Sequence, residues 1–529
     1  MRFFNTAGPI APSDHYHIPP LQRINLDEIL LLIQQKKYFV LHAPRQTGKT
    51  SCLLALQSHL NQTDAYRALY VNVEIAQAAR ENVPEAMRAI VGTIASAARD
   101  TLGDPYLESI WRETLEKGAF AALAELLTHW AMHEPRPSVL MLDEIDALIG
   151  DTLISVLRQL RAGYAKRPAQ FPQSVILCGV RDVRDYRIRS SSTQEIITGG
   201  SAFNIKAESL RLGNFTREEV AALYGQHTDE TGQRFEAEAL TLTWELTRGQ
   251  PWLVNALAYE ACFKSATGRN RQQPITAAML REAKEQLILR RETHLDQLAD
   301  KLQEERVRRV IEPLLAGEEV EAKIPLDDIE YVRDLGLIRP GRPVAIANRI
   351  YQEVIPRELI ASKEQFIAHE TEWYVRPDRR LDMPKLLAAF QQFFRETSEA
   401  WLERFEYKEA GPQLLLQAFL QRIVNRGRRI EREYGLWRKR TDLLVLWPYA
   451  GPDGQESLQR VVLELKVARR AWEQTLAEGL TQTAEYMDKC GAAEGHLLIF
   501  DRRPGRTWDE KISRRTETAG RYTIEVWGM

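Results

Sequence analysis

Several features that mark other protein classes are missing from this 529-residue sequence. The four cysteines lie far apart and form no Cys-x-x-Cys pair, which argues against a disulfide framework or a zinc cluster. No apolar run approaches the roughly 20 residues of a membrane-spanning helix, and the first residues lack the basic-then-apolar layout of a signal peptide. The net charge is only −2, so any preference for nucleic acid has to come from a local cluster. These absences predict a cytoplasmic protein with no contact to a membrane.

The length and the order of apolar segments predict several domains. At 529 residues the chain is too long for one hydrophobic core, and about three or four domains are expected. Strand-like apolar runs alternate with helical segments in the first part of the chain, at residues 37–43, 67–74, 138–144 and 174–180. Buried strands that are separated by helices indicate a parallel sheet covered on both faces, which is an α/β doubly wound core.

The rest of the chain follows a different pattern. From about residue 216 the periodicity is helical, and a short helix ending at Gly336 is followed by a strand-like pair around Pro340 and Gly341, as in a winged helix. From Leu387 the order is helix, strand, strand, helix and strand. The predicted boundaries are 1–213 for the α/β core, 214–300 for a helical lid, 301–360 for a winged helix, 361–385 for a linker and 386–529 for a second α/β domain.

A phosphate-binding loop follows the first predicted strand. The sequence APRQTGKT at residues 43–50 has the spacing of a Walker A loop, with Ala43 in place of the first glycine. Such a loop wraps phosphates with backbone N–H groups at a helix N-terminus; Lys49 would reach the β- and γ-phosphates, and Thr50 would ligate Mg²⁺. The predicted nucleotide-contacting residues of the loop are Ala43, Pro44, Arg45, Gln46, Thr47, Gly48, Lys49, Thr50 and Ser51.

Two later strands end in residues that suit the same site. Asp143 and Glu144 close an apolar run, where Asp143 suits a Walker B position near Mg²⁺ and Glu144 suits activation of the attacking water. A strand that simply ends in solvent-facing acids is the alternative. Arg181 follows the next strand and would sense the γ-phosphate, or it is a solvated surface charge.

These motifs, together with Gly249-Gln-Pro251-Trp252, resemble the AAA-like ATPases of the STAND and origin-recognition group. The resemblance covers about residues 1–360. It implies an ATP site in which Pro251 lies beside the nucleotide, and in which the segment around Asp14–Pro20 contacts the adenine. An ordinary proline at a helix start is the other interpretation of Pro251.

A second group of polar residues lies near the C-terminus. Asp442 begins one apolar strand, and the next strand carries Glu464 and Lys466. Strand alternation puts Glu464 and Lys466 on one face, with Leu463 and Leu465 on the other, and strand pairing can bring Asp442 beside Glu464. Adjacent carboxylates suit Mg²⁺ or Mn²⁺, and Lys466 would orient a water or neutralise charge in the transition state.

Asp442 and Glu464-x-Lys466 resemble the PD-(D/E)xK nuclease superfamily. Gln482 and Tyr486, four residues apart on a predicted helix, match the QxxxY pattern of its RecB-like branch, where they line the site. The family's additional acid is not evident; Glu409 and Gln413 are the candidates. The predicted catalytic residues of the chain are Glu144, Asp442, Glu464, Lys466, Gln482 and Tyr486. The predicted metal ligands are Thr50, Asp143, Asp442, Glu464 and Leu465.

A basic cluster precedes Asp442, which favours DNA as a partner over a merely solvated face. Its members are Arg422, Arg426, Arg428, Arg429, Arg432, Arg438, Lys439 and Arg440, against two acids, Glu431 and Glu433.

The hypothesis from the sequence is an α/β P-loop NTPase with a helical lid and a winged helix, followed by an α/β PD-(D/E)xK nuclease-like domain. It would use ATP and Mg²⁺, with Mn²⁺ as an alternative at the nuclease site, and it would cut DNA under control of the nucleotide state. By resemblance, such proteins defend against phage or mobile DNA and form homo-oligomers. The alternative is a nucleotide-gated, STAND-like switch or scaffold whose C-terminal domain binds DNA or a partner without cleaving.

Overall fold

The computed structural model divides the chain into two compact units. The first comprises Met1–Leu287 and Tyr331–Leu337, and the second comprises Ile288–Glu330 and Ile338–Met529. The described residues are 1–182, 187–189, 196–198, 203–290, 300–315, 324–361, 374–402, 416, 419–420, 429–432, 443–450, 456–468, 471–501, 503 and 505–529.

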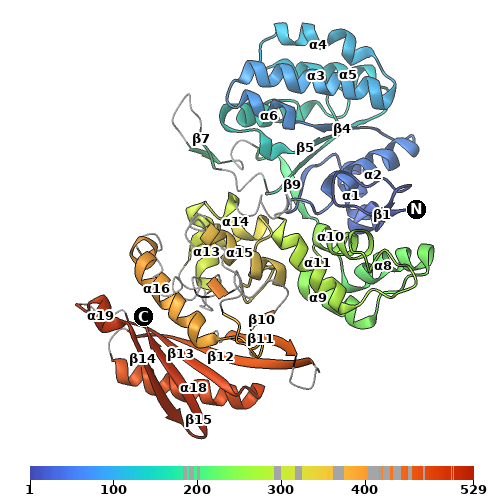
Figure 1. Cartoon of the computed structure of the whole chain (residues 1–529). Helices are drawn as coiled ribbons and strands as arrows, with labels where there is room; N and C mark the ends of the chain where they lie inside the picture. Colours follow the sequence, from blue (N-terminus) through green and yellow to red (C-terminus); the bar gives the residue numbers. More distant parts are fainter. Residues whose placement is uncertain are drawn as a thin grey trace. The chain divides into compact units, whose positions relative to one another are not determined.

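A five-stranded parallel sheet forms the centre of the first unit (Figure 1), which confirms the predicted parallel core. In spatial order its strands are β4 (Arg67–Asn72), β5 (Ser138–Asp143), β6 (Ser174–Gly179), β3 (Tyr38–His42) and β9 (Lys206–Arg211). The sequence pattern predicted four of them and missed β9, which is at the edge and only partly apolar. Because β6 lies between β5 and β3, the ends of these three strands are neighbours. The loops after β3, β5 and β6 therefore share one edge of the sheet.

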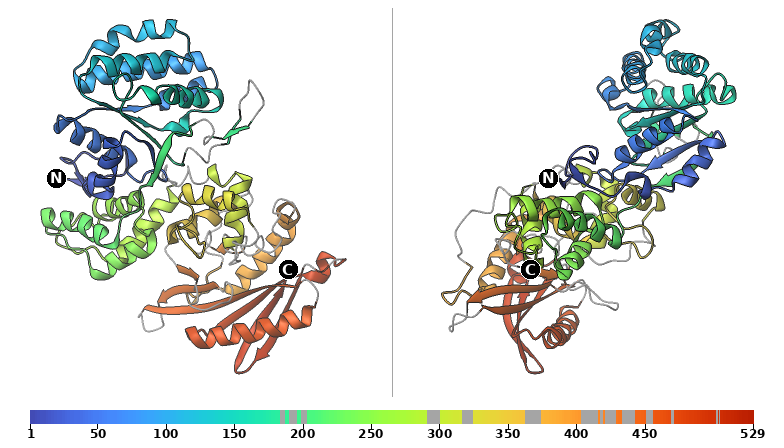
Figure 2. Two further views of the ribbon diagram at one scale, coloured as in Figure 1. Left: turned by 180° about the vertical axis from the view of Figure 1, so that it is seen from behind. Right: turned by 90° about the vertical axis from the view of Figure 1, so that its right-hand side faces the viewer.

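Helices cover both faces of this sheet, as Figures 1 and 2 show. Alternate residues of β3 divide between two cores: Phe39 and Leu41 pack on one face, and Tyr38 and Val40 on the other. The helices on the Phe39 face are α1 (Leu26–Gln34) and α2 (Lys49–Gln62). Those on the Tyr38 face are α3 (Val83–Leu102), α5 (Ala122–His133) and α6 (Gly150–Ala162), with α4 (Tyr106–Glu116) packed on α3 and α5.

A helical bundle follows the sheet in the same unit. Its helices are α8 (Arg217–Thr231), α9 (Ala237–Thr247), α10 (Pro251–Tyr259) and α11 (Ala277–Leu289). The first residues of the chain join this bundle, because the short parallel strands β1 (Phe3–Phe4) and β2 (His15–Tyr16) pack on α10 and α8. Trp252 Nε1 donates to the Thr6 carbonyl at 2.9 Å. The N-terminal segment and the helical bundle therefore pack together as one layer next to the sheet.

The second unit begins with a helical part. Its helices are α13 (Glu305–Leu315), α14 (Leu326–Asp334) and α15 (Arg349–Ala361), and α14 runs on into the first unit at Tyr331. An isolated antiparallel bridge joins Ile338 and Ile346, and Arg339 N donates to the Ala345 carbonyl at 2.8 Å. The winged helix stays a prediction for this part, as do the five domain boundaries.

A six-stranded mixed sheet forms the C-terminal part. Its spatial order is β10 (Arg429–Arg432), β11 (Leu443–Ala450), β12 (Glu456–Ala468), β13 (Glu494–Asp501), β15 (Tyr522–Gly528) and β14 (Ser513–Ala519). The predicted order of helix, strand, strand, helix and strand matches α16 (Met383–Leu402), β11, β12, α18 (Trp472–Cys490) and β13. The short helix α19 (Trp508–Lys511) and the β14–β15 hairpin were not predicted.

The two faces of the C-terminal sheet are both covered. Helices lie on both sides of the sheet in the ribbon views (Figure 2). Leu463 and Leu465 of β12 pack in a core with α16, whereas Val462 packs in a separate core with α18. The predicted alternation along β12 is therefore confirmed, and the even-numbered residues point toward α18. In the described part of the chain, no helix combines the length and the apolar character needed to cross a membrane.

Candidate functional sites

The predicted Walker A residues form a tight loop between β3 and α2. Gly48 has φ +94°, a conformation that a residue with a side chain rarely adopts, and it ends the loop at the first turn of α2. Lys49 is 6 % exposed, and its Nζ donates to the carbonyls of Ala43 at 3.0 Å and Pro44 at 3.2 Å. The lysine ammonium thus lies over the loop, next to the backbone N–H groups at the start of α2. This is the arrangement that binds phosphates.

Arg23 holds the phosphate-binding loop from the side of the N-terminal segment. One guanidinium nitrogen donates to the Thr47 carbonyl at 2.5 Å, and the other donates to the Gly213 carbonyl at 2.8 Å. A Cβ atom at Gly48 would come within 2.7 Å of Arg23 Nη1. Arg23 therefore fastens the loop to the start of the helical bundle. The sequence analysis missed it, because no motif marks a single arginine that lies 20 residues before the loop.

Asp143 and Thr50 meet at the end of β5, as the Walker motifs predict. Asp143 is fully buried, and its Oδ2 accepts from Thr50 Oγ1 at 2.7 Å and from the Tyr70 hydroxyl at 3.0 Å. Its Oδ1 accepts from Glu144 N at 2.9 Å. A carboxylate and a hydroxyl oxygen side by side beside a phosphate-binding loop form a donor set that suits Mg²⁺. These residues fit the predicted cation.

Tyr70 is a further member of this cluster, contributed by the neighbouring strand β4. Replacing Tyr70 with phenylalanine removes one donor to Asp143 and leaves the ring in place. We expect the Mg²⁺ concentration that half-saturates nucleotide hydrolysis to rise about tenfold, because a partner that orients a metal ligand typically contributes this much. A Mg²⁺ titration of the steady-state rate measures the effect. Tyr38→Phe is the matched control: its hydroxyl donates to Pro172 at 3.3 Å, away from Asp143, so the titration should not change.

Glu144 follows Asp143 in a strained backbone conformation. Its φ of +57° is rare for a residue with a side chain, and such strain collects at functional sites. Burial raises the pKa of the Glu144 carboxyl; Lys49 opposes this rise, and Asp143 adds to it. A carboxyl with a raised pKa beside a phosphate-binding loop suits a general base.

Asp146, just after β5, is hydrogen-bonded to the backbone just after β6. Its Oδ2 accepts a hydrogen bond from Val180 N, and a Cβ atom at Gly179 would clash with the Asp146 carboxylate. Burial raises the pKa of Asp146. The carboxylate thereby sets the position of the chain just before Arg181. The third acid of the LDEID run was the signal that could have revealed this role.

Arg181 packs against a segment from far along the chain. Its guanidinium lies 4.7 Å from the centre of the Tyr331 ring, in cation–π geometry. Tyr331 begins the segment Tyr331–Leu337, which belongs to the first unit. Gly336 of this segment has φ +79° and lies against the Pro44 side chain of the phosphate-binding loop. The sequence places Arg181 after β6, and the structure adds Tyr331 as a contact.

The segment Tyr331–Leu337 is also held at the ends of the neighbouring strands β9 and β3. Arg211 Nη2 donates to the Arg333 carbonyl at 2.8 Å, and Arg211 Nη1 lies 4.0 Å from Asp334 Oδ1. His42 Nδ1 lies 3.9 Å from the same oxygen. Burial, with Arg211, lowers the pKa of His42 to about 4, so the imidazole is neutral at pH 7. Of these two neighbours of Asp334, Arg211 is therefore the one that carries a charge at pH 7.

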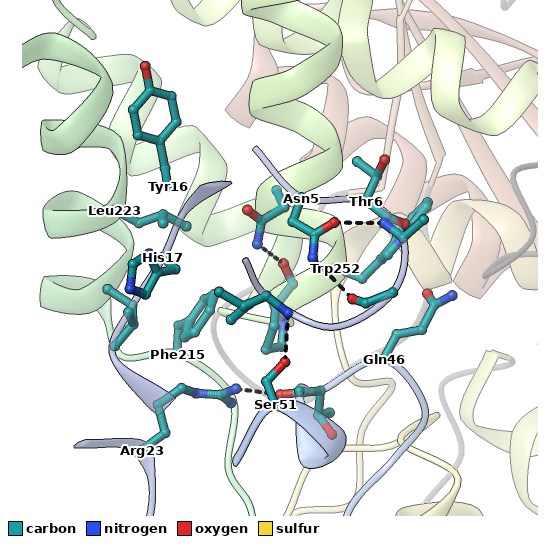
Figure 3. A pocket seen from close by; sticks show the side chains of 18 residues that line it. Asn5, Thr6, Tyr16, His17, Arg23, Gln46, Ser51, Phe215, Leu223 and Trp252 are labelled. Atoms are coloured by element: carbon teal, nitrogen blue, oxygen red, sulfur yellow. Dashed lines mark hydrogen bonds between the residues drawn. The ribbon is translucent and has the colours of Figure 1, made fainter. Parts of the chain in front are cut away.

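A cavity of about 110 Å³ opens beside the phosphate-binding loop (Figure 3). The N-terminal segment, the loop and the helical bundle all contribute to its walls. The lining residues are Asn5, Thr6, Ala7, Gly8, Ile10, Tyr16, His17, Ile18, Arg23, Gln46, Thr47, Gly48, Ser51, Phe215, Leu223, Pro251, Trp252 and Asn255. Pro251, the first residue of α10, and Tyr16, His17 and Ile18 are among them, and their contact with a nucleotide stays a prediction. The wall is largely apolar and aromatic, which suits a flat heterocycle.

At the C-terminal sheet, the structure brings three predicted residues together. Glu464 and Lys466 are 1 % and 6 % exposed, and Lys466 Nζ donates to Glu464 Oε1 and to Gln482 Oε1 of α18. Tyr486 lies one turn further along α18 and packs partly buried against the core on that face. The Leu465 side chain packs in the opposite core, so only its main-chain atoms could reach a metal.

The fourth predicted residue, Asp442, lies outside the described residues. β11 pairs antiparallel with β12, and Leu443 is opposite Leu463, which is the register that the predicted pairing of Asp442 with Glu464 requires. Among the described residues, no group of three or more His, Cys, Asp or Glu side chains could hold a metal ion. Glu409 and Gln413 also lie outside the described residues, as does the basic cluster apart from the backbone of Arg429 and Arg432.

The comparison with protein families matches a part of the first unit. Residues 33–186 match the family described as an AAA domain. The Walker-type ATPase PABY2304 of Pyrococcus abyssi is 13 % identical with a TM-score of 0.43, covering 66 % of this chain and 99 % of that one. Cdc6p from Pyrobaculum aerophilum is 16 % identical with a TM-score of 0.35, covering 66 % and 97 %. A RuvB variant of Thermotoga maritima is 12 % identical with a TM-score of 0.34, covering 63 % and 94 %.

No curated protein matches the chain. The structural likenesses are distant, so the assignment depends on the family match and on the geometry of the loop. Residues 33–186, which carry Lys49, Thr50, Asp143 and Glu144, are therefore a P-loop ATPase domain of the AAA type.

Proposed function

We propose that the first unit binds and hydrolyses ATP. The observation that carries this proposal is the contact of Thr50 with Asp143, directly beside the Lys49 loop and Glu144. Lys49 and the backbone N–H groups at the start of α2 hold the β- and γ-phosphates, and Glu144 accepts a proton from the attacking water. Thr50 and Asp143 would hold Mg²⁺, which supplies charge neutralisation on the triphosphate when bound.

The nucleotide state is proposed to reach the second unit through Arg181. A γ-phosphate attracts the Arg181 guanidinium more strongly than the Tyr331 ring does, because a charge-assisted hydrogen bond exceeds a cation–π contact. The segment Tyr331–Leu337 continues into the second unit at both of its ends. Release of Tyr331 would therefore change how that segment is held.

For the C-terminal sheet we propose metal-dependent cleavage of DNA. The buried cluster of Glu464, Lys466 and Gln482 supports this proposal, because all three come from the two motifs that resemble the nuclease superfamily. Glu464, with Asp442, would hold Mg²⁺ or Mn²⁺, which activates a water when bound. Lys466 would orient that water, and Gln482 would orient Lys466.

The alternative is a nucleotide-gated switch or scaffold whose C-terminal part binds DNA or a partner without cutting. The direct contact of Lys466 with Glu464 supports this alternative, because a buried ion pair can be purely structural. Incubation of the purified protein with plasmid and Mg²⁺ or Mn²⁺, with and without ATP, separates the two functions. Cutting that EDTA abolishes supports the nuclease. An uncut plasmid under all conditions, with ATP turnover intact, supports the switch.

Mass photometry with and without ATP tests the proposed homo-oligomer.

A further inference from the structure

The cavity beside the phosphate-binding loop is small for a nucleotide. Its volume is about 110 Å³, whereas pockets that hold small ligands usually start at about 300 Å³. The phosphate-binding loop, α8 and α10 supply part of its wall, and these elements belong to the packed fold. Another part is formed by residues 5–11 between β1 and β2, which we call the strap. We therefore expect part of the wall to move when a nucleotide enters.

The strap is anchored at both of its ends. Phe4 precedes it and is fully buried, and Tyr16 follows it and is 1 % exposed. The two residues are partners in the pairing of β1 with β2, and their ring centroids lie 4.9 Å apart. The Phe4 ring also packs on Tyr224 of α8, with the centroids 5.4 Å apart. Both ends are therefore fixed on the helical bundle, so a movement would be confined to the residues between them.

The middle of the strap has few contacts. Residues 7–9 are exposed. Among the described residues, two hydrogen bonds join the strap to elements outside the N-terminal segment (Figure 3). Trp252 Nε1 donates to the Thr6 carbonyl at 2.9 Å, and Ile10 N donates to Ser51 Oγ at 3.0 Å. A segment with few buried contacts opens at a low cost in free energy, so the strap is the part of the wall that can move most easily.

The two hydrogen bonds hold the strap on two different elements. Trp252 lies in the first turn of α10, directly after Pro251, whereas Ser51 lies in the first turn of α2, directly after Thr50. The strap therefore connects the helical bundle to the helix that follows the phosphate-binding loop. Breaking both bonds would release residues 6–10 and leave the anchored ends in place.

We propose that the strap is a gate, which opens at Thr6 and Ile10 to let a nucleotide enter or leave the cavity and then closes again. Because the same two bonds hold the closed strap with and without a nucleotide, the gate controls the rates of exchange and not the affinity. A change that weakens the closed strap then raises the association and dissociation rate constants together. Loss of a direct contact with the nucleotide would raise the dissociation rate constant alone. The inference rests on the proposed nucleotide function of this cavity.

Gly8→Ala tests the gate without adding or removing a side-chain contact. Gly8 has φ +71°, where a residue with a side chain is strained, and a Cβ atom there would have nothing within 4 Å. Alanine therefore destabilises the closed strap through its backbone only. We expect the association and dissociation rate constants of N-methylanthraniloyl-ADP each to rise about fivefold, with Kd unchanged. Stopped-flow fluorescence of the full chain measures both constants.

Gly103→Ala is the matched control for this variant. Gly103 has φ +67° at the end of α3, and a Cβ atom there would also have nothing within 4 Å. It does not line the cavity. The same backbone strain is thus introduced away from the strap, and both rate constants should keep their wild-type values.

Trp252→Phe tests the gate through one of its two hydrogen bonds. The change removes the donor to the Thr6 carbonyl and keeps an aromatic ring, so both rate constants should again rise about fivefold. Trp447→Phe is the control, because Trp447 Nε1 also donates to a main-chain carbonyl, that of Arg379 at 2.9 Å, but lies in the second unit. It should leave both rate constants unchanged.

The outcomes separate the gate from the nucleotide site itself. In either Gly8→Ala or Trp252→Phe, unchanged rate constants or a rise in dissociation alone would overturn the inference. Failure of the wild type to bind the fluorescent nucleotide would instead contradict the proposed function.

Discussion

Replacing Glu144 with glutamine is expected to lower kcat for ATP hydrolysis by about 10²–10⁴-fold while ATP affinity remains close to that of the wild type. The amide has the shape of the carboxyl but cannot take a proton from water. Asp143, Thr50 and Lys49 stay in place, so the triphosphate is still held. Steady-state phosphate release and equilibrium binding of ATP measure the two quantities separately.

The rate of ATP hydrolysis should depend on pH through the protonation of the Glu144 carboxyl. Burial raises the pKa of Glu144 above the ordinary value of 4.5, so the group is protonated at a higher pH than an exposed glutamate. The protonated form cannot act as a base, and kcat should therefore fall on acidification through a pKa above 4.5. This acidic limb should be absent from the residual activity of Glu144→Gln.

Lys49→Ala is the contrasting variant, because it should abolish turnover through loss of phosphate binding. Wild-type turnover in Glu144→Gln would remove Glu144 from the mechanism.

The second large effect is expected at the C-terminal sheet. Asp442→Ala should abolish DNA cutting and leave ATP turnover intact, and retained cutting would contradict the assignment of this site. Glu464→Gln should also abolish cutting. It would in addition leave the Lys466 charge buried without its partner, which typically destabilises a protein by about 3–5 kcal/mol. Thermal unfolding has to accompany the cleavage assay for this variant.

A double variant separates catalysis from stability. In Glu464→Leu combined with Lys466→Met both buried charges are removed together, and apolar replacement of a buried ion pair is often neutral or stabilising. We expect a folded protein that turns over ATP and does not cut DNA. A folded double variant that still cuts would show that the pair is only structural. Asp488→Asn on the same helix is the control, because its contact with Arg521 is exposed and screened by solvent, so its loss should leave both stability and activity unchanged.

The phosphate-binding residues could be predicted because their chemistry is local. A tight loop between a buried strand and a helix needs Gly48, Lys49 and Thr50 at adjacent positions, and spacing alone reveals them. The face that Glu464 shares with Lys466 was predictable for a related reason, since side chains alternate along any strand. The contact between Thr50 and Asp143 followed from the two motifs together.

The residues that were missed depend on contacts between distant segments. Tyr70 reaches Asp143 only because β4 pairs with β5. The order of strands in a sheet cannot be predicted from any single stretch of sequence. Arg23 reaches the loop only because the N-terminal segment packs beside it and beside the start of the helical bundle. β9 was overlooked because an edge strand is only half buried and lacks a continuous apolar run.

The sequence by itself determined the parallel core, the phosphate-binding loop and the identity of the acids at the ends of the strands, because periodicity and motif spacing are properties of neighbouring residues. The tertiary structure alone decided that Arg181 packs on the Tyr331 ring, that Gln482 contacts Lys466 and that Arg23 lines the cavity beside the loop. Each of these contacts joins segments whose meeting depends on how whole elements pack, and packing is a cooperative outcome of the complete chain.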